Sequence, residues 1–312
     1  MSRTPAGRRI RARVVRAMVL LVVGLTAVYV FVGDRTVWGE WISVMPPVLW
    51  VLALSPAVVL LRSPMLLFVL ALFMIITSEW PRFGGTRVPA GGTIRVVSWN
   101  IGSGFGGWAD AVAPLKPDIV LVQESAAPSV LPEGFHWYGA LDPGTLSRFP
   151  AAVLPSERVG AWTDPQLLLM EISGRKVLVA NVRLTHPSVV MALVDRKLDT
   201  VVENYRSRIA QYEKLSALLK STARRSDAQA ILLGGDFNIP AQMPSLDPLR
   251  GFLQDAWLTA GSGWGATMPE DLPLVRIDHL WLSSQLEPIS VRVVRLAGSD
   301  HQAVVADIKF RF

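Results

Sequence analysis

The sequence contains no cysteine, which excludes disulfides and thiolate metal sites from this chain. Charge is also scarce: Asp, Glu, Lys and Arg make up 18% of the 312 residues, whereas about 25% is usual for a globular protein. Hydrophobic residues make up 51%. Because the apolar excess is concentrated before residue 81, we expect two parts of different character, an N-terminal membrane region and a separate folded domain.

The N-terminal region contains three apolar runs. A membrane-spanning helix needs about 20 mainly apolar residues, and the runs predict three transmembrane helices over residues 14–33, 43–61 and 64–80. The third run is the shortest. Trp38, Trp41 and Trp80 fall near the predicted ends, where indole rings favour the bilayer interface. The alternative is a cleaved signal peptide followed by a buried helical hairpin.

Basic residues around the start of the first run predict its orientation. They are not accompanied by any acidic residue, so the positive-inside rule places the N-terminus in the cytoplasm. Three crossings then put the following domain outside the cytoplasm, whereas two would leave it inside. We therefore expect a multi-pass protein of the cell membrane whose partner is the lipid bilayer. The basic residues are Arg3, Arg8, Arg9, Arg11, Arg13 and Arg16.

The charge of the rest of the chain is nearly balanced. The six N-terminal arginines equal the net charge of +6, and residues 94–312 hold 21 basic and 22 acidic residues. A sequence pI near 10.0 would ordinarily indicate nucleic-acid binding, but here the basic excess belongs to the membrane region. The near-neutral domain argues against tight non-specific binding to nucleic acid, which depends on Lys and Arg contacts to phosphate.

The remainder of the chain reads as a linker followed by one α/β domain. Residues 81–93 are rich in Gly and Pro and predict the linker. Residues 94–312 alternate short apolar runs with amphipathic segments, which is typical of an α/β domain. Strands are expected over residues 94–99, 118–123, 176–184, 231–233, 277–282, 291–296 and 303–310, and helices over 108–115 and 195–220.

Several predicted strands end in a polar residue that can bind a metal ion or contact a phosphate. Loops at strand ends are where a rigid scaffold presents functional groups. Mg²⁺ prefers oxygen ligands, and a divalent ion neutralises a phosphate ester so that an anionic nucleophile can approach it. The motifs are Trp99-Asn100-Ile101, Gln123-Glu124, Leu184-Thr185-His186, Gly235-Asp236-Phe237-Asn238, Ile277-Asp278-His279 and Ser299-Asp300-His301.

The order of these motifs resembles that of the endonuclease/exonuclease/phosphatase superfamily, which includes deoxyribonucleases, abasic-site endonucleases, inositol polyphosphate phosphatases and neutral sphingomyelinases. The resemblance covers nearly all of residues 94–312. Each motif alone is weak evidence, since Gly-Gly-Asp-Phe-Asn, for example, is also typical of a turn. The resemblance implies a four-layer α/β sandwich, two packed mixed sheets flanked by helices, behind the N-terminal transmembrane helices.

The resemblance also implies a metal site for Mg²⁺, with Mn²⁺ as the alternative ion. Glu124 would be the principal ligand, and Asn100 would lie beside it. Asp300 would bind or position the ion.

The remaining motif residues would act on the substrate. Asp236 would orient or deprotonate the attacking water, Asn238 would hold a phosphate oxygen, and His301 would stabilise the charge developing on the phosphate. His186 would be a second catalytic histidine with Asp278 as its carboxylate partner.

These observations predict a membrane-anchored, divalent-metal-dependent phosphoesterase that hydrolyses a phosphodiester or phosphomonoester by attack of water. Whether the phosphate ester belongs to a lipid or to nucleic acid stays open, and the sequence indicates no protein partner. One alternative is a nuclease acting on extracytoplasmic DNA or RNA. Another is a catalytically silent binding module with the same fold. His279 and Asn181 are expected to have structural roles.

Overall fold

The computed structural model describes residues 5–79, 81–83, 92–102, 107–139, 142–160, 164–188 and 200–311. The chain divides into two compact units, Met1–Trp80 and Pro81–Phe312. Each unit has hydrophobic clusters of its own.

The first unit is helical. Prolines at the first turns of α3 and α4 suit helix starts, because the missing proline N–H would have no partner there. Thr36 and Ser63 cap α2 and α4 by accepting a backbone N–H with their hydroxyl oxygens. The helices are α1 (Pro5–Ala27), which continues through the turns Val28–Val32 and Gly33–Arg35, α2 (Val37–Ser43), α3 (Pro47–Leu61) and α4 (Pro64–Thr77).

One helical stretch of this unit is long and apolar enough to cross a membrane by itself. It runs over Pro5–Arg35, with a mean hydropathy of 2.3 in its most apolar window. The helices α2 and α3 meet that test only as a pair bent by 76°, and α4 has 14 residues. Three separate long spans are therefore not confirmed. The predicted second span is interrupted because Pro46 and Pro47 stop the helix that ends at Ser43.

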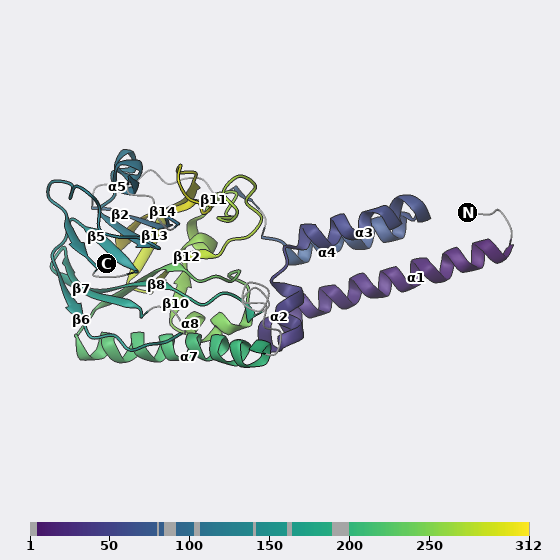
Figure 1. The fold of residues 1–312 in the computed structure, drawn as a ribbon, viewed down its shortest axis with the longest axis horizontal. Coiled ribbons are helices and arrows are strands. Elements are labelled where there is room, and N and C mark those ends of the chain that lie inside the picture. Colours follow the sequence, from purple (N-terminus) through teal and green to yellow (C-terminus); the bar gives the residue numbers. More distant parts are fainter. Residues whose placement is uncertain are drawn as a thin grey trace. The chain divides into compact units, whose positions relative to one another are not determined.

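The helices of the first unit pack against one another through large apolar side chains. Val22 and Leu25 of α1 lie in one cluster with Leu66 and Leu70 of α4, and Figure 1 shows α3 and α4 running beside α1. Many apolar side chains nevertheless point outward. Examples are Leu20 at 70% exposed, Phe31 at 75%, Leu60 at 75% and Phe68 at 67%.

The second unit is built on two six-stranded mixed sheets, as the sequence predicted. The first sheet has the order β13-β14-β2-β3-β5-β4 and the second β10-β12-β9-β8-β7-β6. The neighbours β2 and β3 are parallel, as are β8 and β9, and all other neighbours are antiparallel.

The strands of the first sheet are β2 (Ile94–Asn100), β3 (Ile119–Gln123), β4 (His136–Tyr138), β5 (Gly144–Ser147), β13 (Leu286–Val294) and β14 (Ala303–Phe310). Those of the second are β6 (Ala151–Leu154), β7 (Gln166–Ile172), β8 (Arg175–Arg183), β9 (Ala230–Asp236), β10 (Leu253–Asp255) and β12 (Asp278–Ser283).

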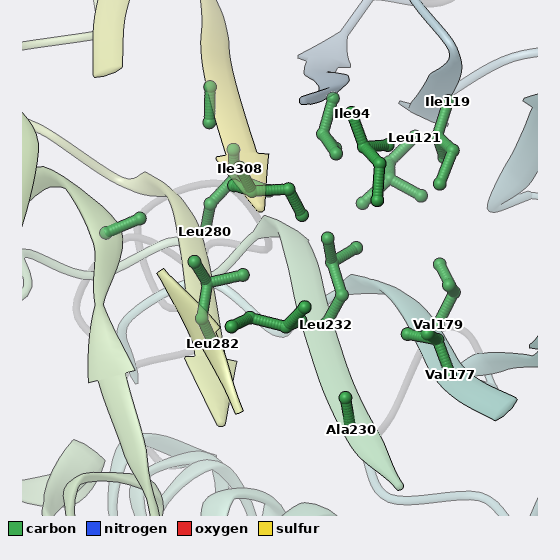
Figure 2. Close-up of a cluster of buried hydrophobic side chains, with 14 of the residues drawn as sticks. Ile94, Ile119, Leu121, Val177, Val179, Ala230, Leu232, Leu280, Leu282 and Ile308 are labelled. Atoms are coloured by element: carbon green, nitrogen blue, oxygen red, sulfur yellow. The ribbon is translucent and has the colours of Figure 1, made fainter. Parts of the chain in front are cut away.

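The two sheets pack face to face around the central core shown in Figure 2. Successive residues of a strand point to opposite faces, so Ile94 and Val96 of β2 enter this core while Val97 and Trp99 enter a second core on the outer face. That outer core includes α5 (Trp108–Val112). On the other side, α7 (Val201–Arg225) covers the second sheet (Figure 1). The predicted four-layer sandwich is confirmed.

The observed elements differ from the sequence prediction in the long helix and in the linker, and the strand predicted over residues 291–296 runs over Leu286–Val294. The helix expected over residues 195–220 begins at Val201 among the described residues and continues to Arg225; residues 195–199 lie outside the described part. The predicted linker 81–93 contains a strand, β1 (Arg82–Phe83), which pairs with β11 (Ser262–Gly263). Its pairing partner lies almost 180 residues away, so local composition could not predict it.

The topology brings several strand ends to one edge of the sandwich. The carboxyl ends of parallel β2 and β3 lie together in the first sheet, and those of β8 and β9 lie together in the second. The strands β14 and β12 run antiparallel to them and therefore begin at the same edge. This edge carries the residues described next.

Candidate active site

Five of the predicted site residues lie at the ends of these strands or directly beside them. Asn100 and Asp236 are the last residues of β2 and β9, and Glu124 directly follows β3. Asp278 begins β12 in register with Asp236. His301 lies two residues before β14.

Asn100 links the predicted metal ligand to the predicted base. Its amide Nδ2 donates to Glu124 Oε1 and to Asp236 Oδ2, each at 3.1 Å. Its Oδ1 accepts the Gly102 N–H at 3.1 Å. Because the Asn100 side chain is buried and bonded on both of its ends, it fixes the two carboxylates relative to each other across the sheets.

Asp236 is held by three donors. Oδ1 accepts the backbone N–H of Asn238 at 2.8 Å, and Oδ2 accepts Nδ2 of Asn238 at 2.9 Å as well as the Asn100 amide. Asn238 also donates to the Leu184 carbonyl at 2.7 Å. Asn238 has φ 55°, a left-handed conformation that Asn tolerates better than most residues. The chain bends directly after Asp236, and the two Asn238 contacts position the carboxylate.

Asp278 pairs with His301. The Asp278 Oδ2 atom lies 2.9 Å from Nδ1 of His301, and the His301 backbone is held by Ser299 Oγ and by the Trp99 indole, which donates to the His301 carbonyl. The predicted pairing of Asp278 with His186 is therefore wrong. Asp278 faces His301 because β12 lies opposite β14 across the sandwich, an arrangement that the order of motifs does not reveal.

The group Asp236, Asp278 and His301 is suited to a divalent cation. One ligand atom from each residue lies within 4.8 Å of the others, and all three side chains are buried. Asp278 Oδ1 is buried and has no hydrogen-bond partner among the described residues. A buried carboxylate oxygen without a partner is costly, and oxygen donors are what Mg²⁺ and Mn²⁺ take. The group could therefore hold a divalent cation, although it contains none of the ligands that the resemblance implies, Glu124, Asn100 and Asp300.

Burial and neighbouring charges shift two of these groups. Burial, followed by the Asp278 carboxylate, raises the pKa of Asp236 to about 7. Burial alone would lower the pKa of His301, but the charge and hydrogen bond of Asp278 outweigh it and raise that pKa to about 10. At neutral pH the site therefore offers a carboxylate able to exchange a proton beside a charged imidazolium.

Two residues that the sequence analysis missed complete the edge. The guanidinium of Arg183, the last residue of β8, contacts Glu124 Oε1 at 2.8 Å and Asp142 Oδ2 at 2.9 Å. Asp142 also accepts the Glu124 N–H at 2.8 Å, and burial raises the pKa of Asp142 despite Arg183. One signal was available: Arg183 closes an apolar strand at the same edge as Asp236. Asp142, before a proline, resembles an ordinary turn residue.

The other two predicted residues lie at the margin of this network. His186 is half-buried and hydrogen-bonds the Asn238 side chain, and burial lowers its pKa. Asp300 is exposed and lines a hollow of about 420 Å³ beside Gly102. The catalytic role of His186 and the metal role of Asp300 stay predictions. The hollow is lined by Gly102, Pro269, Glu270, Asp271, Gly298, Ser299 and Asp300.

The structural roles expected for two polar residues are supported by their contacts. Asn181 accepts from Gln123 at 2.6 Å and donates to the carbonyls of Val122 and Gly144, so it joins the two sheets below the site. His279 is fully buried. Its ring nitrogens contact the Arg276 guanidinium at 2.9 Å and the Ile239 carbonyl at 2.8 Å.

Similar folds occur in solved structures. A mannosyl-6-phosphatase from Bacteroides thetaiotaomicron is 14% identical, with a TM-score of 0.56, over 70% of this chain and 100% of that chain. An endonuclease/exonuclease/phosphatase family protein from Bacteroides vulgatus is also 14% identical, with a TM-score of 0.53, over 70% of this chain and 99% of that one. Truncated TDP2 from Caenorhabditis elegans is 20% identical, with a TM-score of 0.52, over 72% of this chain and 100% of that one. At these identities the likeness concerns the fold.

The family model gives the classification. No curated protein matches this chain, but the model of the endonuclease/exonuclease/phosphatase family matches residues 97–301, a range that begins in β2 and ends at His301. The matched range is about two thirds of the sequence and contains every candidate site residue. The chain therefore belongs to the endonuclease/exonuclease/phosphatase family.

Proposed function

We propose that this protein is a membrane-anchored phosphoesterase that uses a divalent metal ion and hydrolyses a phosphodiester or phosphomonoester by attack of water. The observation that carries the proposal is the hydrogen-bonded chain from Glu124 through Asn100 to Asp236, which lies beside the Asp278–His301 pair. Members of this family are hydrolases of phosphate esters, which supports the reaction class.

Asp236 is the base in this proposal. Its raised pKa lies near neutral pH, which is where a general base balances its proton affinity against the fraction that is ionised. The Asn100 and Asn238 amides occupy Oδ2, while Oδ1 accepts one backbone N–H and retains a second lone pair. That oxygen is the proton acceptor for the attacking water.

His301 is the electrophilic partner. Its raised pKa keeps the imidazole charged at neutral pH, and Nδ1 is engaged by Asp278. The remaining ring nitrogen, Nε2, is the donor to a phosphate oxygen. A fixed donor that is already charged stabilises the negative charge developing on the phosphoryl group without having to reorganise.

The metal ion would be held by oxygen atoms at this edge, from Glu124, Asn100 and Asp300 as the resemblance implies and from Oδ1 of Asp278, which has no hydrogen-bond partner among the described residues. When bound, a divalent ion neutralises the phosphate and polarises its oxygens. Mg²⁺ is the proposed ion and Mn²⁺ the substitute, since both accept carboxylate oxygens.

The observations support a class of substrate and not one particular phosphate ester. One structure with a similar fold is named a mannosyl-6-phosphatase, so the fold accommodates monoester chemistry in that protein. The balanced charge of residues 94–312 disfavours a nuclease that grips nucleic acid by its phosphates. We therefore place lipid or small-molecule phosphate esters ahead of DNA and RNA.

Membrane anchoring is supported by the surface of the first unit. Soluble proteins rarely expose large contiguous apolar patches, yet Phe31, Leu60 and Phe68 are each at least two thirds exposed. The core helix of a soluble protein is mostly buried, whereas only 17% of the most apolar window of Pro5–Arg35 is buried. These features favour a lipid environment for α1.

We further propose that α3 and α4 cross beside α1, so that the catalytic unit lies outside the cytoplasm. The Tyr29 hydroxyl donates to the Met45 carbonyl just before α3. Arg11 donates to the carbonyls of Leu61 and Arg62 at the end of α3. From Arg11 to Tyr29 a helix rises about 27 Å, close to the bilayer core of about 30 Å.

Topology can be measured separately from activity. An alkaline phosphatase reporter fused after residue 92 should be active when expressed in bacteria, because three crossings place it outside the cytoplasm. An inactive reporter that is nevertheless produced would contradict the proposed orientation. A matched fusion after Arg62, which precedes the last crossing, should be inactive.

The proposed function is tested by hydrolysis with the full chain in detergent. With Mg²⁺ or Mn²⁺ present, the protein should release p-nitrophenol from bis-p-nitrophenyl phosphate or p-nitrophenyl phosphate, and chelation should abolish the release. The Asp236→Ala variant is the control. Equal rates for the variant and the original protein, or none from both, would overturn the proposal. A panel of sphingomyelin, inositol phosphates, DNA and RNA then ranks the substrates.

A further inference from the structure

Arg183 joins two carboxylates beside the proposed metal site. The guanidinium contacts Glu124 Oε1 at 2.8 Å and Asp142 Oδ2 at 2.9 Å. The three side chains are only 20–23% exposed. Two oxygens from separate carboxylates thus converge on one cation. This is the arrangement in which two carboxylates would otherwise hold a divalent ion.

The position of this cation is set by the sheet. Arg183 ends β8 in register with Asp236, the last residue of the parallel strand β9. Residues paired in this way in neighbouring strands point to the same face. The charge of Arg183 is therefore fixed at the site edge by a hydrogen-bonded ladder and not by a loop.

The same contacts hold an unfavourable backbone. Glu124 has φ 57°, a left-handed conformation that is unfavourable for a residue with a side chain. Asp142 accepts the Glu124 N–H, and Arg183 holds the Glu124 carboxylate. A predicted metal ligand is thus held in one orientation at both its backbone and its side chain.

The formal charges of the buried groups at this edge of the sandwich indicate how many divalent ions can bind there. Among the described residues of this network, the partly or fully buried charged groups are four carboxylates and two cations, which at formal charge leaves two negative charges. One divalent ion neutralises that remainder, whereas a second would leave an excess of positive charge. Asp300 is exposed, where solvent screens its charge. The groups counted are Glu124, Asp142, Asp236, Asp278, Arg183 and His301.

We propose that Arg183 is a positioning residue that takes the place of a second metal ion, so that the site binds one divalent ion per chain. This inference rests on the proposed function. The guanidinium occupies Glu124 Oε1 and Asp142 Oδ2, the two oxygens that would otherwise hold a second ion, and it orients Glu124 toward Asn100. Arg is suited to this task because its planar group carries several donors in a fixed arrangement.

The test counts bound ions and does not depend on turnover. Isothermal titration of the full chain in detergent with Mn²⁺, checked by the electron paramagnetic resonance signal of free Mn²⁺, should give one ion per chain. The Arg183→Met variant should bind two, because the Glu124 and Asp142 carboxylates are released. Adding Asp142→Asn to it should restore one. Arg183→Lys keeps the charge and should bind one.

Hydrolysis gives a second readout. Loss of a residue that orients a metal ligand commonly costs about 10- to 100-fold in activity, and we expect Arg183→Met to lose at least about tenfold, with partial recovery in Arg183→Lys. The matched control is Arg158→Met, which removes an exposed arginine paired with Asp164. This control should keep both the stoichiometry and the rate.

The possible results distinguish a failure of the proposed role of Arg183 from a failure of the proposed metal-dependent hydrolysis. Two ions bound by the original protein with normal hydrolysis, or one ion bound by a folded Arg183→Met variant, would overturn the role of Arg183 alone. No bound ion at all would overturn this role and the metal dependence of the proposed function together. If Arg183→Met does not fold, the original protein and Arg183→Lys still decide, since each must bind one ion.

Discussion

The active-site edge holds two carboxylate pairs, each with one cationic partner. On one side Arg183 joins Glu124 and Asp142, with exposures of 20–23%. On the other side His301 pairs with Asp278 beside Asp236, and these side chains are almost completely buried. The groups are alike in formal charge but differ in their contact with water.

This difference in burial assigns different tasks to the two pairs. Burial and a second carboxylate raise the pKa of Asp236 to about 7, so that side can take and release a proton near neutral pH. On the Arg183 side the cation is a guanidinium, which stays protonated. The buried side with Asp236 is suited to proton transfer, and the Arg183 side is suited to holding the ligands in a fixed geometry. Asn100 connects the two by donating to Glu124 and Asp236.

The largest expected effect comes from removing the carboxylate of the buried side. Asp236→Asn keeps the size of the side chain but cannot accept a proton, and loss of a general base costs about 10²–10⁴-fold. We expect kcat to fall by about 10³-fold with metal present. The matched control is Asp247→Asn, an exposed carboxylate that pairs with Arg250 and should leave kcat unchanged. Similar rates for both variants would contradict the contrast.

The Asp278–His301 pair should act as a unit. His301→Gln removes the charged donor, and loss of one such donor costs about 10²–10³-fold in kcat. Asp278→Asn should lose a similar factor, because the carboxylate keeps His301 charged at neutral pH. The double variant should be hardly worse than either single one. If the losses of the two single variants multiply in the double variant, the two residues act independently, and Asp278 and His301 do not work as a unit.

The smallest expected effect concerns stability without metal. The pKa of Asp236 rises from about 4 when unfolded to about 7 when folded, so only the unfolded chain loses this proton as pH rises between these values. Folding stability therefore falls over that range and stays lower above it. Asp236→Asn removes this penalty and should raise Tm by a few degrees at pH 8, since about 1 kcal/mol corresponds to roughly 2–4 °C.

The Tm gain of Asp236→Asn at low pH, compared with the gain at pH 8, tests whether the carboxylate is the cause. Near pH 4 Asp236 is protonated in the folded protein, so the gain from Asp236→Asn should shrink toward zero. Thermal unfolding followed by circular dichroism in the presence of a chelator gives both values. A gain of equal size at pH 4 and pH 8 would show that the carboxylate is not shifted upward.

The sequence was sufficient for much of the fold because its signals are local. The apolar runs that become β2, β3 and β14 were predicted close to their observed bounds. Polar residues at strand ends gather at one edge because parallel strands share a direction. That Asn100, Glu124 and Asp236 lie together across two sheets was implied by the resemblance of the ordered motifs to the family, and their hydrogen bonds show it.

The features that were missed depend on contacts between distant segments. Asp278 bonds His301 and not His186 because of how β12 faces β14, which no local pattern encodes. Arg183 meets Asp142 across the sandwich edge, 41 residues away in sequence. The predicted second span, residues 43–61, includes the break before Pro47, where α3 begins.

In the proposed mechanism, water activated at Asp236 attacks phosphorus at this edge. Hydrolysis of bis-p-nitrophenyl phosphate by the full chain in ¹⁸O-labelled water, with Mg²⁺ and product analysis by mass spectrometry, tests it most directly. We expect one ¹⁸O atom in each p-nitrophenyl phosphate product and none in p-nitrophenol, with the signal lost in Asp236→Asn. Label in p-nitrophenol, or label in the phosphate that persists without Asp236, would contradict the account.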